Sequence, residues 1–222
     1  MNQNFKNIHS VCVIVAHPDD ETLWTGGIIL MHPEWDCKVF SLCRASDTDR
    51  APKFHKALLR LGASGHMADF DDGPEQISLP ENEIQQSILN YIDNKHFDLI
   101  LSHAPKGEYT RHKRHEEVSK AVLTLWYKGN LNADIVWLFA YTDENKTHLP
   151  IPEREAHYKL PLSPSILKDK YNIITEIYGF TADSWEARTT PRDEAFWIFN
   201  SPIEAKKWFK ERMMDIENFS SL

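Results

Sequence analysis

Short apolar runs alternate with amphipathic segments along the first two-thirds of the chain. Runs rich in β-branched residues predict strands at Val11–Ala16, Cys37–Cys43, His66–Phe70, Asp98–His103 and Asp134–Tyr141. The segments between them place apolar residues at helical spacing and predict helices at about Glu21–Met31, Pro52–Leu61, Pro80–Asn94 and His115–Tyr127. Because strands alternate with helices, we expect an α/β fold built on a Rossmann-like, doubly wound and mostly parallel sheet.

The pattern changes after Tyr141, where prolines become frequent. Helices are predicted there at about Ser165–Tyr178 and Pro202–Met213, with a strand near Phe196–Phe199. We expect residues 1–222 to form one domain. Its Rossmann-like core is expected at about residues 1–142, and a C-terminal cap with closing elements at about residues 143–222.

Composition narrows the class of protein. The formal net charge of −8 argues against broad binding to nucleic acid or to anionic membranes. No apolar run is long enough to span a bilayer, and the first one ends in His-Pro-Asp-Asp, so we expect no membrane span, no signal peptide and a cytoplasmic location. Cys12, Cys37 and Cys43 each lie in or beside an apolar run and are expected to be buried and unbridged. The sequence does not determine the oligomeric state, and it is compatible with a homo-oligomer.

Two loops concentrate residues of the kinds that bind metals. His17, Asp19 and Asp20 follow the first predicted strand, and His112 and His115 follow the fourth. In the common strand order 3-2-1-4-5, strands one and four are neighbours where the order reverses, and open α/β sheets bind ligands beyond the carboxyl ends of the strands at that point. We therefore expect the two loops to face each other across one crevice.

The residue types in these loops indicate a particular chemistry. One histidine and one aspartate from the first loop, with one histidine from the second, form a ligand set typical of catalytic zinc, which keeps one position for water. A second carboxylate can act as general base, and the other histidine can stabilise the oxyanion of a tetrahedral intermediate. This is the chemistry of a metal-assisted amide or ester hydrolase.

A purely structural alternative exists for each loop. The segment Pro18–Glu21 also suits an ordinary helix N-terminus, where aspartate caps the helix and acidic residues favour its dipole. The segment His112–Glu117 could equally be a solvated helix start. The placement of both loops at one switch point favours the metal site.

The sequence Ala-His-Pro-Asp-Asp-Glu at residues 16–21 resembles the signature of the PIG-L (LmbE-like) family. Members of that family are zinc-dependent de-N-acetylases of compounds that contain N-acetylglucosamine. A second motif supports the resemblance, because family members carry His-x-x-His in the loop after strand four, here at residues 112–115 and preceded by Gly-Glu-Tyr at 107–109. The resemblance covers roughly the first two-thirds of the chain.

The resemblance also implies roles for the residues of the two loops. It implies that His17, Asp20 and His115 are the ligands of a zinc ion. Ferrous iron is the alternative metal for this site. It implies that Asp19 is the general base and that His112 stabilises charge on the intermediate.

Substrate contacts follow the family pattern less closely. Arg44 resembles the arginine of a Thr-Arg-Gly-Glu motif that contacts substrate, although the sequence here is Cys-Arg-Ala-Ser. Tyr109 lies one residue before the position at which some members carry a further oxyanion contact. The usual His-Pro-Asp-His is His-Lys-Arg-His here, and the added Lys113 and Arg114 either favour an anionic substrate or face solvent. Three residues of the C-terminal third have open roles: Lys170, Tyr178 and Trp185.

These observations lead to the hypothesis of a zinc-dependent hydrolase that removes an acetyl group from an N-acetylated amino sugar, a small-molecule substrate. Two alternatives stay open. One is a non-catalytic sugar- or nucleotide-binding module on the same scaffold, and the other is an amidase that acts on a non-sugar amide. A dinucleotide-binding dehydrogenase is not expected, because no Gly-x-Gly-x-x-Gly follows the first strand.

Overall fold

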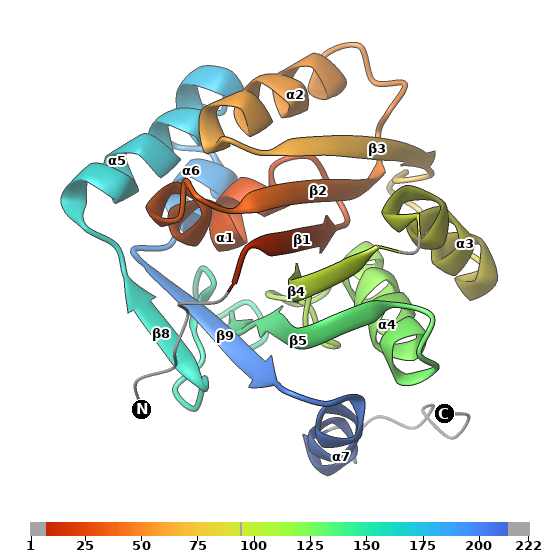
Figure 1. Cartoon of the computed structure of the whole chain (residues 1–222). Coiled ribbons are helices and arrows are strands. Elements are labelled where there is room, and N and C mark those ends of the chain that lie inside the picture. The colour runs from red at the N-terminus through yellow and green to blue at the C-terminus, as the bar shows by residue number, and fades with distance from the viewer. Residues whose placement is uncertain (1–7, 94, 213–222) are drawn as a thin grey trace.

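A seven-stranded sheet with helices on both faces forms the centre of the molecule (Figure 1). The computed structural model of the protein describes residues 8–93 and 95–212. Its strands are β1 (Ser10–Val15), β2 (Asp36–Cys43), β3 (Ser64–Phe70), β4 (His96–Ser102), β5 (Asn132–Phe139), β6 (Tyr141–Thr142), β7 (Ile151–Pro152), β8 (Tyr158–Pro161) and β9 (Asp193–Phe199). Its helices are α1 (Asp20–Met31), α2 (Arg50–Leu61), α3 (Glu81–Ile92), α4 (Lys113–Tyr127), α5 (Pro164–Asn172), the π-helical turn η2 (Ile173–Ile177), α6 (Trp185–Thr189) and α7 (Pro202–Arg212).

The strand order of the sheet is β3-β2-β1-β4-β5-β9-β8. Strands β1 to β5 are parallel, and the predicted order 3-2-1-4-5 and the α/β fold class are confirmed. Because the chain winds outwards from β1 in one direction and from β4 in the other, right-handed crossovers place helices on opposite faces. Helices α1, α2 and α5 form one contacting group, and α3, α4 and α7 form the other.

The C-terminal third extends this sheet. Strand β9 pairs antiparallel with β5, and the short strand β8 pairs antiparallel with β9. The predicted strand near Phe196 is the second half of β9, whereas β8 is too short and too polar to show a strand pattern. The division of the chain at about residue 142 stays a prediction.

Helix boundaries agree with the sequence to within a few residues. The helix predicted at Ser165–Tyr178 is α5 followed by η2, so its hydrogen-bond pattern changes after Asn172. The last residues of two predicted helices, Asn94 and Met213, lie outside the described residues.

The core is centred on β1, whose residues from Val11 onwards are buried on both faces of the sheet. Helices cover both faces of a parallel sheet, which explains the uninterrupted apolar run in the sequence. Cys12, Cys37 and Cys43 are buried and unbridged, as predicted. Across residues 8–93 and 95–212, the structure contains no helix of the length and apolar character required to cross a bilayer.

Helix α1 approaches β9 closely at Gly27. The backbone N–H groups of Gly27 and Ile28 each donate to the Glu194 carboxylate at 2.7 Å. Lys170 of α5 donates to the same carboxylate at 2.7 Å, and both charged side chains are fully buried. A Cβ atom at residue 27 would lie 2.5 Å from Cδ2 of Leu162 and 2.8 Å from Oε1 of Glu194, so the contact requires glycine.

Gly27→Ala should lower the free energy of unfolding by about 1–3 kcal/mol, because the added methyl group overpacks this contact. Gly26→Ala is the matched control, since its Cβ would meet its nearest neighbour at 3.4 Å. In the control, replacing a mid-helix glycine should stabilise the protein by up to about 1 kcal/mol. Urea denaturation followed by circular dichroism measures both variants, and equal free energies of unfolding would contradict the close approach.

Candidate active site

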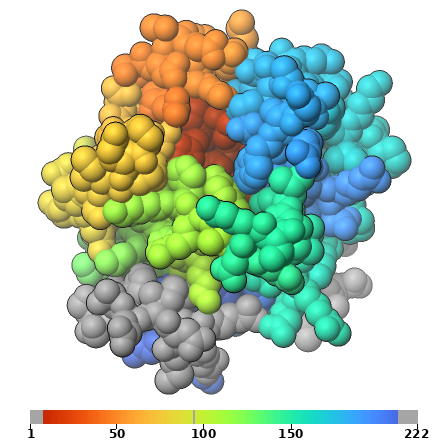
Figure 2. Space-filling model, turned by 180° about the vertical axis from the view of Figure 1, so that it is seen from behind, coloured from red at the N-terminus to blue at the C-terminus, as the bar shows by residue number. Residues whose placement is uncertain are grey.

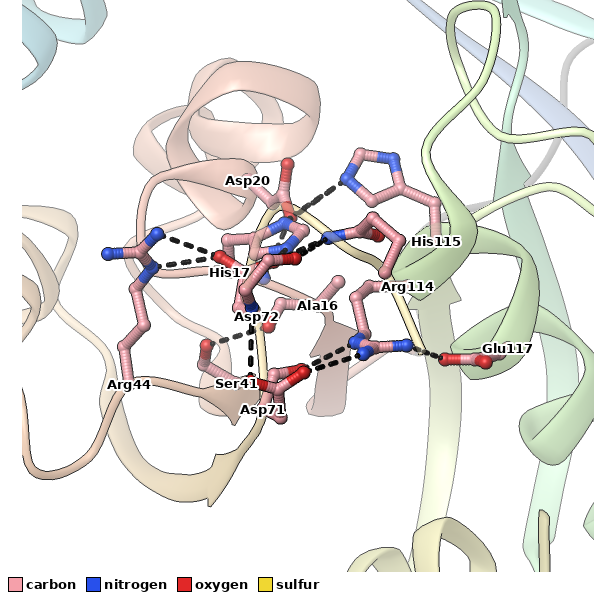
Figure 3. A network of polar contacts seen from close by, with 12 residues as sticks. Ala16, His17, Asp20, Ser41, Arg44, Asp71, Asp72, Arg114, His115 and Glu117 are labelled. Atoms are coloured by element: carbon pink, nitrogen blue, oxygen red, sulfur yellow. Dashed lines mark hydrogen bonds and ion pairs between the residues drawn. The ribbon is translucent and has the colours of Figure 1, made fainter. Parts of the chain in front are cut away.

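The loops that follow β1 and β4 meet at the carboxyl edge of the sheet. Strands β1 and β4 pair directly, so the segments that leave them start side by side. His17 and Asp20 lie between β1 and the first turn of α1, and His115 lies in the first turn of α4. Figure 3 shows the side chains of these three residues converging from the two loops. The predicted meeting of the two loops is confirmed.

Three side-chain atoms form a compact triangle at this position. His17 Nδ1 lies 3.0 Å from Asp20 Oδ2, and His115 Nε2 lies 3.3 Å from His17 Nδ1 and 3.4 Å from Asp20 Oδ2. With metal–ligand bonds of about 2.0–2.1 Å, the ligands of a tetrahedral zinc ion are about 3.3 Å apart. The two nitrogen atoms and one carboxylate oxygen therefore fit a divalent metal in both spacing and chemistry.

The ring nitrogens that point away from this triangle are also held by carboxylates. His17 Nε2 lies 3.1 Å from Oδ1 of Asp72, and His115 Nδ1 lies 2.5 Å from Oε2 of Glu108. Such partners orient metal-binding imidazoles and fix their tautomers. Asp72 follows β3, so a third loop joins the site (Figure 3).

Arg114 fixes the position of that third loop. Its Nε donates to the backbone oxygen of Asp71 at 2.6 Å, and its Nη2 donates to the backbone oxygen of Ile77 at 2.9 Å. Its Nη1 donates to Glu117 at 2.6 Å, and the side chain is fully buried. Neither sequence interpretation of Arg114 is correct, because its side chain is buried and does not line the cavity described below. The three acceptors offset the burial of its charge.

Asp19 adopts an unusual backbone conformation between the metal-type residues. Its φ angle is 128°, in a region that non-glycine residues rarely adopt. Its N–H donates to the buried carboxylate of Glu21 at 3.0 Å, and Tyr178 donates to the same carboxylate at 2.8 Å. Asp19 is the N-cap residue of α1, yet its side chain accepts no capping hydrogen bond. The helix-cap alternative therefore does not explain this carboxylate.

Burial and neighbouring charges shift the pKa values of the two aspartates in opposite directions. Burial raises the pKa of Asp19 well above its ordinary value, and the Asp20 carboxylate beside it adds to the shift. Burial alone would also raise the pKa of Asp20, but the imidazoles of His115 and His103 hold it well below its usual range. Asp20 is therefore suited to bind a cation as a carboxylate, and Asp19 is suited to accept and release a proton.

His112 lies on the open side of the triangle. Its ring centroid is 4.4 Å from that of His17 and 4.7 Å from that of His115. Burial, followed by the proximity of His115 and His17, lowers the pKa of His112 to about 3. Its buried Nδ1 has no hydrogen-bond partner within residues 8–93 and 95–212. His112 is thus a neutral imidazole with an unpartnered nitrogen beside the candidate metal position.

A cavity of about 170 Å³ opens in front of these groups. Figure 2 shows the red N-terminal segment at the base of a hollow that is bordered by the orange segment with α2 and the blue segment with α6. His17 and Asp20 of the triangle line it together with Asp19 and His112, and other lining residues include Arg44, Arg50, Tyr109, Trp185 and Glu186. Tyr109 and Trp185 contact edge to face, with ring centroids 4.6 Å apart.

Both substrate-binding candidates from the sequence line this cavity. Arg44 donates through Nε and Nη2 to the Asp72 carboxylate at 3.0 and 2.8 Å, which holds its guanidinium at the cavity wall. Tyr109 lies between Trp185 and the imidazole of His112. By contrast, Lys170 is buried against Glu194 and is not among the residues that line the cavity.

Sequence reasoning missed three residues that contact the site. No site role is assigned to them from the sequence: Asp72 follows the predicted strand His66–Phe70, His103 ends a predicted strand, and Glu108 belongs to the Gly-Glu-Tyr lead-in. One signal could have identified them: each is a histidine or carboxylate just beyond the carboxyl end of a parallel strand, β3 or β4.

Comparison with known proteins identifies the family to which this sequence is similar. The family model PIG-L, described as GlcNAc-PI de-N-acetylase, matches residues 12–126, which is more than half of the chain. An uncharacterized protein of Acanthamoeba polyphaga mimivirus is 20% identical over 178 residues, which cover 73% of this chain and 75% of the viral protein.

Solved structures share the fold. The N,N'-diacetylchitobiose deacetylase from Pyrococcus horikoshii aligns with a TM-score of 0.66 at 16% identity, covering 89% of this chain and 86% of its own. A teicoplanin deacetylase, solved in a zinc-inhibited form, aligns with a TM-score of 0.62 at 14% identity, covering 86% and 98%. The 4-carboxy-2-hydroxymuconate hydratase from Pseudomonas putida aligns with a TM-score of 0.61 at 17% identity, covering 97% and 92%. At these identities the likeness concerns the fold alone.

His115→Ala should remove the metal from the purified protein, because it deletes one corner of the triangle. We expect about one zinc or iron ion per wild-type chain by mass spectrometry, and strongly reduced metal in the variant. His55→Ala is the control, since His55 is an exposed histidine on α2. Equal metal content in all three proteins would contradict the ligand set.

Proposed function

The chain belongs to the PIG-L (GlcNAc-PI de-N-acetylase) family, and from this premise we propose that it is a metal-dependent hydrolase that removes an acetyl group from an N-acetylated amino sugar. One observation carries the proposal: His17 and Asp20, two corners of the triangle, line the same cavity as Asp19 and His112, and the buried His115 completes the triangle. We expect the metal ligands, the proton acceptor and the oxyanion partner to act on one acyl group bound in this cavity. The deacetylases among the structural neighbours support this reading of the cavity.

The proposed metal is zinc, with ferrous iron as the alternative. His17 Nδ1, Asp20 Oδ2 and His115 Nε2 would hold it. When bound, such a metal lowers the pKa of a water molecule and polarises the acyl carbonyl group. The carboxylates behind both imidazoles, Asp72 and Glu108, would keep the two rings oriented towards it.

Asp19 is the proposed general base. Its carboxylate takes a proton from the attacking water, whose oxygen forms a bond to the acyl carbon. As the bond between that carbon and nitrogen breaks, Asp19 returns the proton to the leaving amine. Its raised pKa suits this role, because a catalytic acid and base works best when its pKa lies near the working pH. The backbone conformation held by Glu21 fixes where the carboxylate points.

His112 is the proposed oxyanion partner. As a neutral imidazole it can donate one N–H to the negatively charged oxygen that develops during attack. Its ring centroid lies 4.4 Å from that of His17 and 4.7 Å from that of His115, so an N–H of this ring would be close to the proposed metal position.

The sugar is proposed to bind against the outer wall of the cavity. Trp185 and Tyr109 offer apolar ring surface for one side of the pyranose, whereas Arg44 and Glu186 offer polar groups for its hydroxyls. The presence of candidate base and oxyanion residues beside the triangle favours an enzyme over a non-catalytic binding module. An amidase for a non-sugar amide stays the second hypothesis, and the aromatic wall favours the sugar.

Asp19→Asn should lower kcat by about 100- to 10,000-fold while leaving the metal bound, because Asp19 is a proton acceptor and not a corner of the triangle. Release of free amine from a panel of N-acetylated mono- and disaccharides measures turnover, and mass spectrometry measures metal. Asp169→Asn is the control, since this partly exposed aspartate of α5 pairs with Arg60 at the surface and does not line the cavity.

Two results would count against the proposal. Retained turnover in Asp19→Asn would exclude this residue as the base. A metal-loaded wild-type protein that releases amine only from non-sugar acetamides would move the assignment to the second hypothesis.

A further inference from the structure

A buried carboxylate lies between two histidines behind the candidate metal position. Glu108 and His103 are fully buried, and so is His115. Oε2 of Glu108 lies 2.8 Å from His103 Nδ1 and 2.5 Å from His115 Nδ1. Oε1 accepts the backbone N–H of Ala104 at 3.2 Å, which anchors the carboxylate to the loop after β4. Glu108 is not among the residues that line the cavity.

We propose that Glu108 is a positioning residue that sets which histidine binds the metal, by holding both His103 and His115 in the tautomer with a proton on Nδ1. The inference rests on the proposed metal-dependent function and deepens it. A carboxylate oxygen can only accept, so both Nδ1 atoms that face it must donate. Each ring is then left with a lone pair on Nε2.

The two lone pairs have different surroundings. His115 Nε2 faces Asp20 at 3.4 Å and the imidazole of His17 at 3.3 Å, so it completes the triangle. His103 Nε2 accepts the backbone N–H of Ala16 at 3.0 Å. Although His103 Nε2 lies only 3.5 Å from Asp20, its lone pair is already used by the backbone. His115 is thereby assigned as the ligand and His103 as a support.

Packing reinforces the assignment. The rings of His103 and His115 stack with centroids 3.9 Å apart, which leaves little room for either ring to turn over. The hydrogen bond that the Ala16 N–H donates to His103 also connects the end of β1 to the end of β4, between the two loops of the site.

Glu108→Gln tests the inference with a side chain of the same shape. The amide carries no charge, and its NH2 group cannot accept: it takes the place either of the oxygen that accepts the Ala104 N–H or of the oxygen that faces the two imidazoles, so one of these sets of hydrogen bonds is lost. We expect zinc affinity, measured by competition with a chromophoric chelator, to fall by about 10- to 100-fold. Glu116→Gln is the matched control. Glu116 follows His115 in α4, and its carboxylate binds Arg111 at the surface, so the variant removes the same charge without touching the two imidazoles. The control should bind zinc as the wild type does.

A second measurement needs no variant and so does not depend on whether Glu108→Gln folds. Nitrogen-edited NMR of the histidine rings in the wild-type protein should show His103 and His115 protonated at Nδ1, with His115 binding zinc through Nε2. A His115 bound through Nδ1, or a zinc affinity that Glu108→Gln leaves unchanged, overturns this inference alone. A wild type that binds no zinc or iron overturns the proposed function, and this inference with it.

Discussion

Burial of charge is the constraint on which this structure depends. Asp20 and Glu108 are 3% and 0% exposed, and a carboxylate removed from water is stable only when opposite charges or donors offset the loss of hydration. Imidazoles from β4 and from the start of α4 provide those partners. The adjacency of β1 and β4 in the sheet brings the groups together, so the topology and the electrostatics of the site require each other.

Much of the fold could be predicted from the sequence, because a parallel sheet covered on both faces needs uninterrupted apolar strands. The run from Val11 to Val15 follows from that requirement, and the strand order around it is the common one for alternating strands and helices joined by right-handed crossovers. Strand β8 could not be predicted in the same way. Its four residues gain their strand conformation from pairing with β9, a contact between distant segments that no local pattern records.

The residues of the candidate site also differ in whether the sequence alone predicts their role. The cluster of His17, Asp19, Asp20, His112 and His115 could be predicted because metal-binding residue types gather in short motifs after strands, and the family resemblance implies which of them bind the metal. The supports behind them could not, because their roles arise from burial. Arg114 reads as one more cation in a charged loop, and only the folded chain places it beneath the segment that carries Asp72. Residue type and spacing reveal the atoms that touch a ligand, whereas the groups that orient those atoms depend on tertiary contacts.

The contacts of helix α1 with the C-terminal third limit how this protein can be recombined. Tyr178 bonds the glutamate that fixes Asp19, and Lys170 bonds the glutamate that receives two N–H groups of α1. A chimera that exchanges residues after Tyr141 for those of a relative would therefore replace Tyr178, which bonds Glu21, and Glu194, which accepts the two N–H groups of α1, and would disturb the loop that carries Asp19 from a distance. New substrate ranges are more readily built by changing side chains on the cavity wall than by exchanging the segment as a module.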